Sequence, residues 1–208
     1  MLKDISFKVS KSFIVYPGDP KYLMENIFSI ENHGYNVSKI SMGSHFSTHI
    51  DAPHHFFEFG KTISDFDIND FSGKAHVIEI LEGNINKTHI DSINIEENDI
   101  ILFKANPNFD GTKILNSYNA LLPEAAMYLV DKKVKLVGID YISIEPENNT
   151  DFSTHKILLN NNIPILESID LRQVNAGIYH LFAFPINIEN SDAAPVRAVL
   201  KFYWQIWK

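Results

Sequence analysis

The chain has no cysteine among its 208 residues. This absence excludes disulfide bonds, zinc sites built from thiolates and catalysis by a cysteine nucleophile, and it suits a reducing compartment. A metal site in this protein would therefore need histidine and carboxylate ligands. Neutral imidazole and ionised carboxylate are the usual ligands for zinc, manganese or iron.

Basic residues are scarce as well. The 18 Lys and Arg are outnumbered by 26 Asp and Glu, which gives a formal net charge of −8. Nucleic acids and anionic membranes require clustered basic side chains, so neither is expected as a partner. No apolar run approaches the length of a membrane span, and Asp4 lies where a signal peptide would need an apolar stretch. A cytoplasmic protein is expected.

Several hydrolase signatures are also missing, namely His-Glu-x-x-His, Gly-x-Ser-x-Gly and a glycine-rich phosphate loop. What the chain has instead is a cluster of histidines. Four of its nine histidines lie in the segment His45–His55, which reads His-Phe-Ser-Thr-His-Ile-Asp-Ala-Pro-His-His. His49 and Asp51 are two residues apart, so on an extended segment their side chains point to the same side. The segment is either a metal site, or a surface loop or core strand whose histidines are satisfied by the backbone.

The remaining pattern predicts one mixed α/β domain over residues 1–208, with more strand than helix. Helices are expected from Pro123 to the lysines at 132–133, and from Asp151, as the N-cap, to Leu159. Apolar and β-branched runs predict strands over residues 37–42, 75–81, 99–104, 134–144, 163–167, 179–184 and 196–207. His76, on one of these strands and without an acidic neighbour, is expected to be structural or exposed.

Two later residues are candidates to complete a metal site. His155 lies on the apolar face of the second predicted helix, and Glu167 ends an apolar strand, where an unpaired polar group would be costly. A helix, an asparagine turn and a returning strand can bring them together, although a single buried histidine is more often a core residue than a ligand. Tyr16 precedes the turn at residues 17–20, so it either lines a pocket or packs in the core.

The motif His45-x-x-x-His49-x-Asp51-Ala-Pro-x-His55 resembles the signature of the metal-dependent cyclase/hydrolase family that contains the bacterial kynurenine formamidases. The likeness covers nearly the whole chain, through Asp4-Ile-Ser6, Tyr16-Pro-Gly-Asp-Pro20, Gly60-Lys-Thr-Ile63, Val137-Gly-Ile-Asp140, His155, Glu167 and Pro195-Val-Arg197. It implies the family's swivelling β/β/α fold, usually as a homodimer or homotetramer. The aromatic segment at residues 202–207 is compatible with burial in a subunit interface.

The resemblance also implies roles for the site residues. It places two divalent metals in each subunit, zinc most favoured and manganese as the alternative. By this resemblance the first metal is held by His45, His49 and Asp51, Asp51 bridges to the second, His155 holds the second, Glu167 contacts both, and His55 is the proton donor and acceptor. Ser47 departs from the family's usual glycine, and Tyr16 replaces the tryptophan that stacks on the substrate in kynurenine formamidases.

The implied activity is hydrolysis of the C–N bond of a formamide or amide, as arylformamidase does when it converts N-formylkynurenine to kynurenine and formate in tryptophan catabolism. The small-molecule substrate can instead be another cyclic amide, lactone or ester, as for isatin hydrolases and polyketide cyclases. Two further alternatives are a metal-binding relative without catalysis and a metal-free domain with a pH-sensitive histidine surface.

Overall fold

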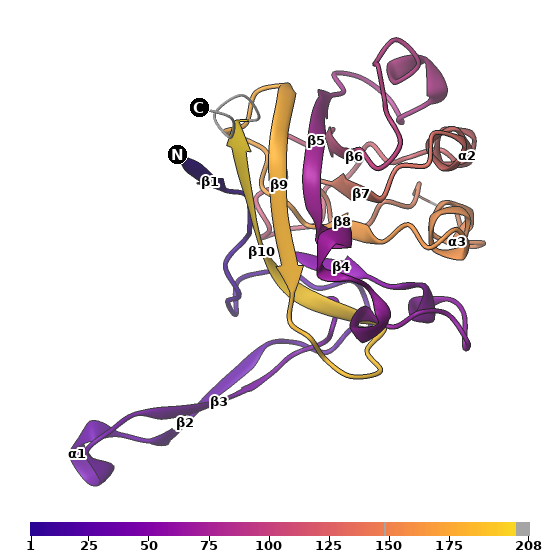
Figure 1. Cartoon of the computed structure of the whole chain (residues 1–208). Coiled ribbons are helices and arrows are strands. Elements are labelled where there is room, and N and C mark those ends of the chain that lie inside the picture. Colours follow the sequence, from indigo (N-terminus) through magenta and orange to yellow (C-terminus); the bar gives the residue numbers. More distant parts are fainter. Residues whose placement is uncertain (148, 203–208) are drawn as a thin grey trace.

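A computed structural model describes residues 1–147 and 149–202 of the chain, and a curved β-sheet forms its centre (Figure 1). The strands of this sheet are β1 (Leu2–Asp4), β4 (His49–Asp51), β5 (Ser72–Glu79), β6 (Ile100–Lys104), β7 (Leu136–Ile139), β8 (Ile165–Glu167), β9 (Gly177–Pro185) and β10 (Ala193–Phe202). Their order is β1-β10-β4-β8-β7-β6-β5-β9, and β9 also pairs with β10. Seven strands therefore close into a barrel-like ring, to which β1 adds along one edge of β10. The expected strand-rich α/β fold is confirmed.

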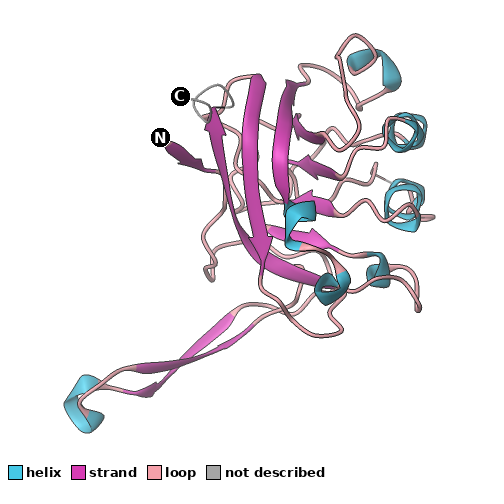
Figure 2. Ribbon diagram, in the orientation of Figure 1, coloured by secondary structure: helices cyan, strands magenta, loops and turns pink. Residues whose placement is uncertain are grey.

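Strands β5 to β8 are parallel, and two helices cover their outer face (Figure 2). The helices are α2 (Pro123–Asp131) and α3 (Ser153–Asn160), and four short 3-10 helices lie at Pro53–His55, Ile63–Asp65, Ile68–Phe71 and Lys87–His89. Alternate side chains of each strand point to opposite faces, so the fold has two cores. In β8, Leu166 points into the ring and Ile165 packs on the side of the helices.

The helix starts follow from the sequence at α2 but not at α3. Pro123 opens α2, as expected, because its missing N–H is not needed in the first turn. The N-cap of α3 is Phe152, with a φ of 50°, so the prediction of Asp151 as the cap is wrong. The carboxylate of Glu145 instead accepts hydrogen bonds from the backbone N–H groups of Thr154 and His155. A side chain from outside the helix thus satisfies its first turn.

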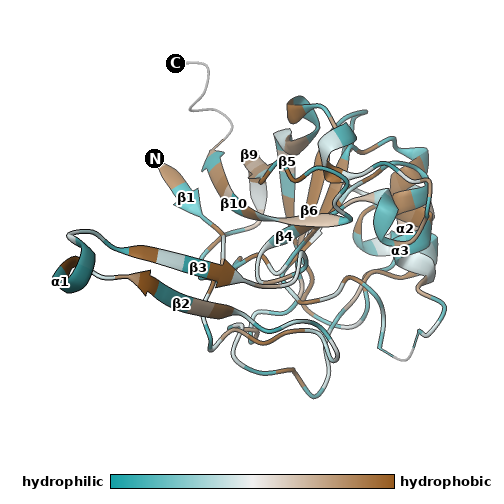
Figure 3. Cartoon of the chain, turned by 90° about the horizontal axis from the view of Figure 1, so that it is seen from below, coloured by the Kyte–Doolittle hydropathy of each residue, from teal (hydrophilic) through white to brown (hydrophobic). Residues whose placement is uncertain are grey.

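A hairpin projects from the body of the molecule (Figures 1 and 3). It consists of β2 (Leu23–Phe28) and β3 (Val37–Ser41), joined through the short helix α1 (Ile30–His33), and it forms a separate two-stranded sheet. The sequence predicted β3 but not β2. We call residues 23–41 the arm.

Within residues 1–147 and 149–202, none of the helices has the length and apolar character needed to cross a membrane. The predicted strand over 196–207 is present as far as Phe202, and residues 203–207 lie outside the described part of the chain.

Candidate metal centre

Strand β4 orients the first half of the site. Ile50 is fully buried in the core of the ring, so its neighbours His49 and Asp51 point to the opposite face. The strand is paired on both sides, with β10 and with β8. Asp51 Oδ1 lies 3.2 Å from Nε2 of His49 and 2.7 Å from Nδ1 of His45. The predicted juxtaposition of these three side chains is what the structure shows.

The antiparallel register between β4 and β8 supplies the second carboxylate. Glu167 is the direct partner of His49 across the two strands, and its Oε2 lies 3.7 Å from Nε2 of that histidine. His155 comes from α3, with its Nε2 3.3 Å from Oε1 of Glu167 and 3.9 Å from Oδ2 of Asp51. The carboxylates of Asp51 and Glu167 therefore lie between His155 on one side and the histidines at positions 45 and 49 on the other.

Each candidate histidine ligand is held by one ring nitrogen and presents the other to the carboxylates. The Nδ1–H of His49 donates to the carbonyl of Ser47 at 2.8 Å, and that of His155 donates to Glu145 at 2.7 Å. His45 uses Nε2 for Asp192, at 2.9 Å. Outer partners of this kind fix the tautomer and ring direction of histidines that bind metals.

Glu145 and Asp192 contact the candidate ligands His155 and His45, and the sequence analysis predicts neither of them. Neither belongs to the histidine motif, and each meets its histidine only through the fold. Asp192 precedes β10, whose first residues pair with β4, and its Oδ2 also lies 3.8 Å from Nδ1 of His55. It thus contacts both the candidate ligand His45 and the candidate proton carrier.

The residues present fit a divalent cation. Both carboxylate oxygens of Asp51 and Nε2 of His49 are buried and have no hydrogen-bond partner within residues 1–147 and 149–202, although Oδ1 of Asp51 lies within ion-pair distance of the imidazoles of His45 and His49. Leaving such groups unsatisfied is costly, and an ionised carboxylate especially so. Asp51 belongs to two groups of possible ligand atoms, one with His49 and Glu167 and the other with His45 and His55. Within each group the ligand atoms all lie within 4.8 Å of one another. An oxygen and nitrogen donor set of this kind suits zinc or manganese.

The raised pKa values of His45 and His155 also show that the buried carboxylates favour positive charge at this site. Burial alone would lower the pKa of His45, but the carboxylates of Asp51 and Asp192 outweigh it and raise this pKa to about 11. Burial likewise opposes protonation of His155, yet Glu145, Glu167 and Asp51 raise its pKa to about 10. Protons on these imidazoles therefore balance the buried carboxylates, and a cation bound there would displace them.

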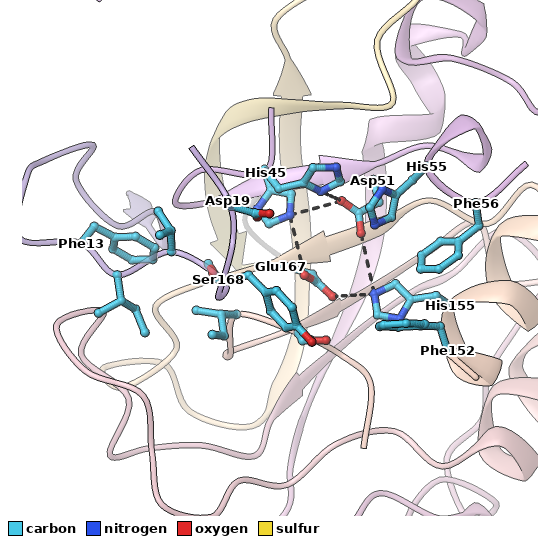
Figure 4. Close-up of a pocket in the computed structure, with 16 residues that line it drawn as sticks. Phe13, Asp19, His45, Asp51, His55, Phe56, Phe152, His155, Glu167 and Ser168 are labelled. Atoms are coloured by element: carbon cyan, nitrogen blue, oxygen red, sulfur yellow. Dashed lines mark ion pairs between the residues drawn. The ribbon is translucent and has the colours of Figure 1, made fainter. Parts of the chain in front are cut away.

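A cavity of about 320 Å³ opens onto these groups (Figure 4). Its size is in the range of small-molecule sites, which are mainly apolar with a few polar groups. Its apolar walls are made by Phe13, Ile14, Val15, Tyr16, Phe56, Ile142 and Phe152. Tyr16, for which the sequence left two explanations open, lines this cavity and is 45% exposed at its mouth. His55 lines it too, with its side chain 30% exposed.

Ser47 takes the backbone conformation that glycine would favour. Its φ is 63°, a left-handed conformation that costs an L-residue roughly 1–2 kcal/mol. The Ser47 hydroxyl donates a hydrogen bond to the carbonyl of Phe7 at 3.3 Å, and the Ser47 carbonyl accepts one from Nδ1–H of His49. Ser47 therefore adopts the same left-handed turn that glycine would, and its carbonyl orients the ring of His49.

The chain resembles known proteins over nearly its whole length. The family model described as "Putative cyclase" matches residues 3–146. A kynurenine formamidase of Bacillus mycoides is 33% identical over 201 residues, which are 95% of this chain and 96% of that protein. A solved structure described as a potential metal-dependent hydrolase with cyclase activity has a TM-score of 0.85 at 30% identity, covering 97% of this chain and 98% of the other. Isatin hydrolase A from Labrenzia aggregata, bound to benzyl benzoate, shares the fold, with a TM-score of 0.87 at 20% identity and coverage of 96% and 93%.

Proposed function

The chain belongs to the putative cyclase family, and from that premise we propose that it is a metal-dependent hydrolase that cleaves the C–N bond of an aryl formamide, with N-formylkynurenine as its substrate. One observation carries the proposal. Three imidazoles and two carboxylates from separate elements converge beside a cavity with apolar walls. Buried atoms of His49 and Asp51 in this group have no hydrogen-bond partner within the described residues. The proposal includes two divalent cations per subunit, zinc ahead of manganese, a cytoplasmic location and one domain over residues 1–208.

Each of the residues then has a definite task. A divalent cation, when bound, polarises a carbonyl oxygen and lowers the pKa of water beside it. His45, His49 and Asp51 would hold the first cation, His155 would hold the second, and Asp51 and Glu167 lie where they can contact both. The buried position of the two carboxylates limits access of bulk water, which strengthens electrostatic interactions with the substrate.

His55 is placed to move the proton. Its Nδ1 faces Asp192, which leaves Nε2 for exchange with the substrate. Its ring lies 4.1 Å from that of His45 and 6.3 Å from that of His155, measured between centroids, so it stands over the gap between the candidate ligands. An imidazole in this position can take a proton from the attacking water and return it to the leaving nitrogen.

The apolar walls suit an aromatic substrate. The rings of Phe56 and Phe152 lie 5.4 Å apart between centroids, and Phe56 also packs beside His155. Tyr16 is held at the mouth by a turn in which the N–H of Asp19 donates to its carbonyl. We propose that Tyr16 stacks on the substrate ring in the place that tryptophan takes in kynurenine formamidases.

The substrate is tested with N-formylkynurenine and isatin on metal-loaded protein. We expect hydrolysis of N-formylkynurenine, and in Tyr16→Ala a KM raised by roughly three- to tenfold with kcat nearly unchanged, because aromatic stacking contributes about 0.5–1.5 kcal/mol. Phe59→Ala is the matched control, since Phe59 is 94% exposed and outside the cavity. Turnover of isatin but not of N-formylkynurenine would contradict the proposed substrate while keeping a hydrolase of this family.

A further inference from the structure

One acidic side chain of the cavity takes no part in the metal centre. Among the described residues, three carboxylates line the cavity, those of Asp19, Asp51 and Glu167. The last two lie within 3.7 Å of Nε2 of His49, whereas Asp19 forms no ion pair with the other residues of the cavity wall (Figure 4). Asp19 is half-buried, and its carboxylate has no hydrogen-bond partner within the described residues. Its charge is therefore available to a ligand.

The turn at residues 17–20 restricts the position of Asp19. Proline fixes its own φ and keeps the residue before it extended, so Pro17 and Pro20 limit the backbone of both Tyr16 and Asp19. The backbone N–H of Asp19 donates to the carbonyl of Tyr16 at 3.0 Å, and both residues line the cavity. The free carboxylate thus belongs to the same restricted turn as the aromatic ring that we propose for stacking.

The charge of the cavity wall favours one sign of ligand in this place. No Lys or Arg within residues 1–147 and 149–202 lines the cavity, so an anionic group of a substrate finds no basic partner along the walls. The carboxylates of Asp51 and Glu167 are matched by imidazoles, and by cations when these are bound. Asp19 is the carboxylate without such a match. It attracts a cationic group and repels an anionic one.

We propose that Asp19 binds the ammonium group of the substrate and thereby determines specificity. The inference rests on the proposed function and narrows its substrate class to aryl formamides with a cationic side chain. N-formylkynurenine belongs to this class, because α-amino groups are protonated at neutral pH. Its carboxylate, without a basic partner in the cavity, is expected to point to solvent. An aryl formamide whose only charge is a carboxylate, such as N-formylanthranilate, is expected to be a poor substrate.

Ligand binding tests the role of Asp19 without depending on turnover. Calorimetry on metal-loaded protein compares kynurenine with kynurenine acetylated on its α-amino group. We expect wild type to bind kynurenine roughly tenfold more tightly than the acetylated form, because a hydrogen bond between charged groups is stronger than a neutral one. Asp19→Asn keeps the shape of the side chain without its charge and should bind the two ligands about equally. The bulk added by acetylation affects both proteins alike, so their difference isolates the ammonium group.

Two further variants separate charge from other effects. Asp19→Glu retains the carboxylate and should keep most of the preference for kynurenine. Asp91→Asn, the same substitution at an exposed acid outside the cavity, should keep all of it. Circular dichroism and metal content should match in all four proteins, which separates loss of the ammonium contact from loss of the fold or of the metal.

The outcomes distinguish failure of this inference from failure of the proposed function. Equal binding of both ligands by wild type would overturn the role of Asp19, as would a full preference in Asp19→Asn. Hydrolysis of N-formylkynurenine together with either result would keep the proposed function. A preference that depends on Asp19, in a protein that hydrolyses no aryl formamide, would support the ammonium site and contradict the proposed reaction.

Discussion

Replacement of Asp51 by asparagine is expected to remove tight metal binding and to lower kcat/KM about a thousandfold or more, since a catalytic cation supplies several kcal/mol of transition-state stabilisation. Asp51 is the one side chain shared by both groups of ligand atoms, and it lies within 4 Å of three histidines. Asparagine has the same shape but offers no negative charge. Metal affinity by calorimetry and turnover of N-formylkynurenine are the two measurements.

The fold of Asp51→Asn should survive. The substitution removes a buried charge without creating a cavity, and the surrounding strands remain paired. Asp91→Asn, an exposed acid outside the cavity, is the matched control and should bind metal normally. His49→Ala provides a second test, because loss of metal with the fold intact identifies a functional site. Unchanged metal affinity in both variants would contradict the ligand assignment, and collapse of both folds would favour a structural metal.

Replacement of His55 by alanine is expected to lower kcat by roughly a hundredfold to ten-thousandfold, the usual contribution of a general acid–base group. KM and metal content should change little, because the proposed ligands are still in place. The measurements are steady-state kinetics and elemental analysis of the same preparation. His54→Ala is a stringent control, since His54 is the adjacent histidine and does not line the cavity.

The alternative for His55 is a ligand role, because its ring belongs to one of the two groups of close ligand atoms. In that case His55→Ala would lose metal as well as activity. Loss of activity with full metal content supports the proton role, and equal losses in His54→Ala and His55→Ala would contradict it.

The first half of the site could be predicted because it is local. His49 and Asp51 belong to one short strand, so the two-residue repeat alone places them on one face. The convergence of His155 and Glu167 also follows from neighbouring elements, a helix, a turn and a strand. These contacts depend on backbone geometry within a few residues, which sequence patterns describe well.

The outer partners could not be predicted, because strand pairing sets them. Asp192 contacts His45 because β10, which is distant in sequence, pairs with β4. His76 was expected to have no acidic neighbour, yet its Nε2 lies 2.7 Å from Asp99 Oδ2 between the parallel strands β5 and β6. Such contacts follow from topology rather than from spacing.

The strand β2 escaped prediction for a different reason. The sequence Leu-Met-Glu-Asn-Ile-Phe over residues 23–28 has no alternation of apolar and polar residues, and both faces of the strand are exposed. A pattern that assumes one buried face cannot detect such a strand.

We propose that the buried carboxylates and imidazoles hold a catalytic cation. Elemental analysis of protein purified without chelator, paired with N-formylkynurenine hydrolysis before and after chelation, tests this role most directly. We predict bound zinc or manganese at two equivalents per chain, with turnover that is lost on chelation and restored when the metal returns. A protein that binds neither metal, even after both are added back, would contradict a metal-dependent mechanism.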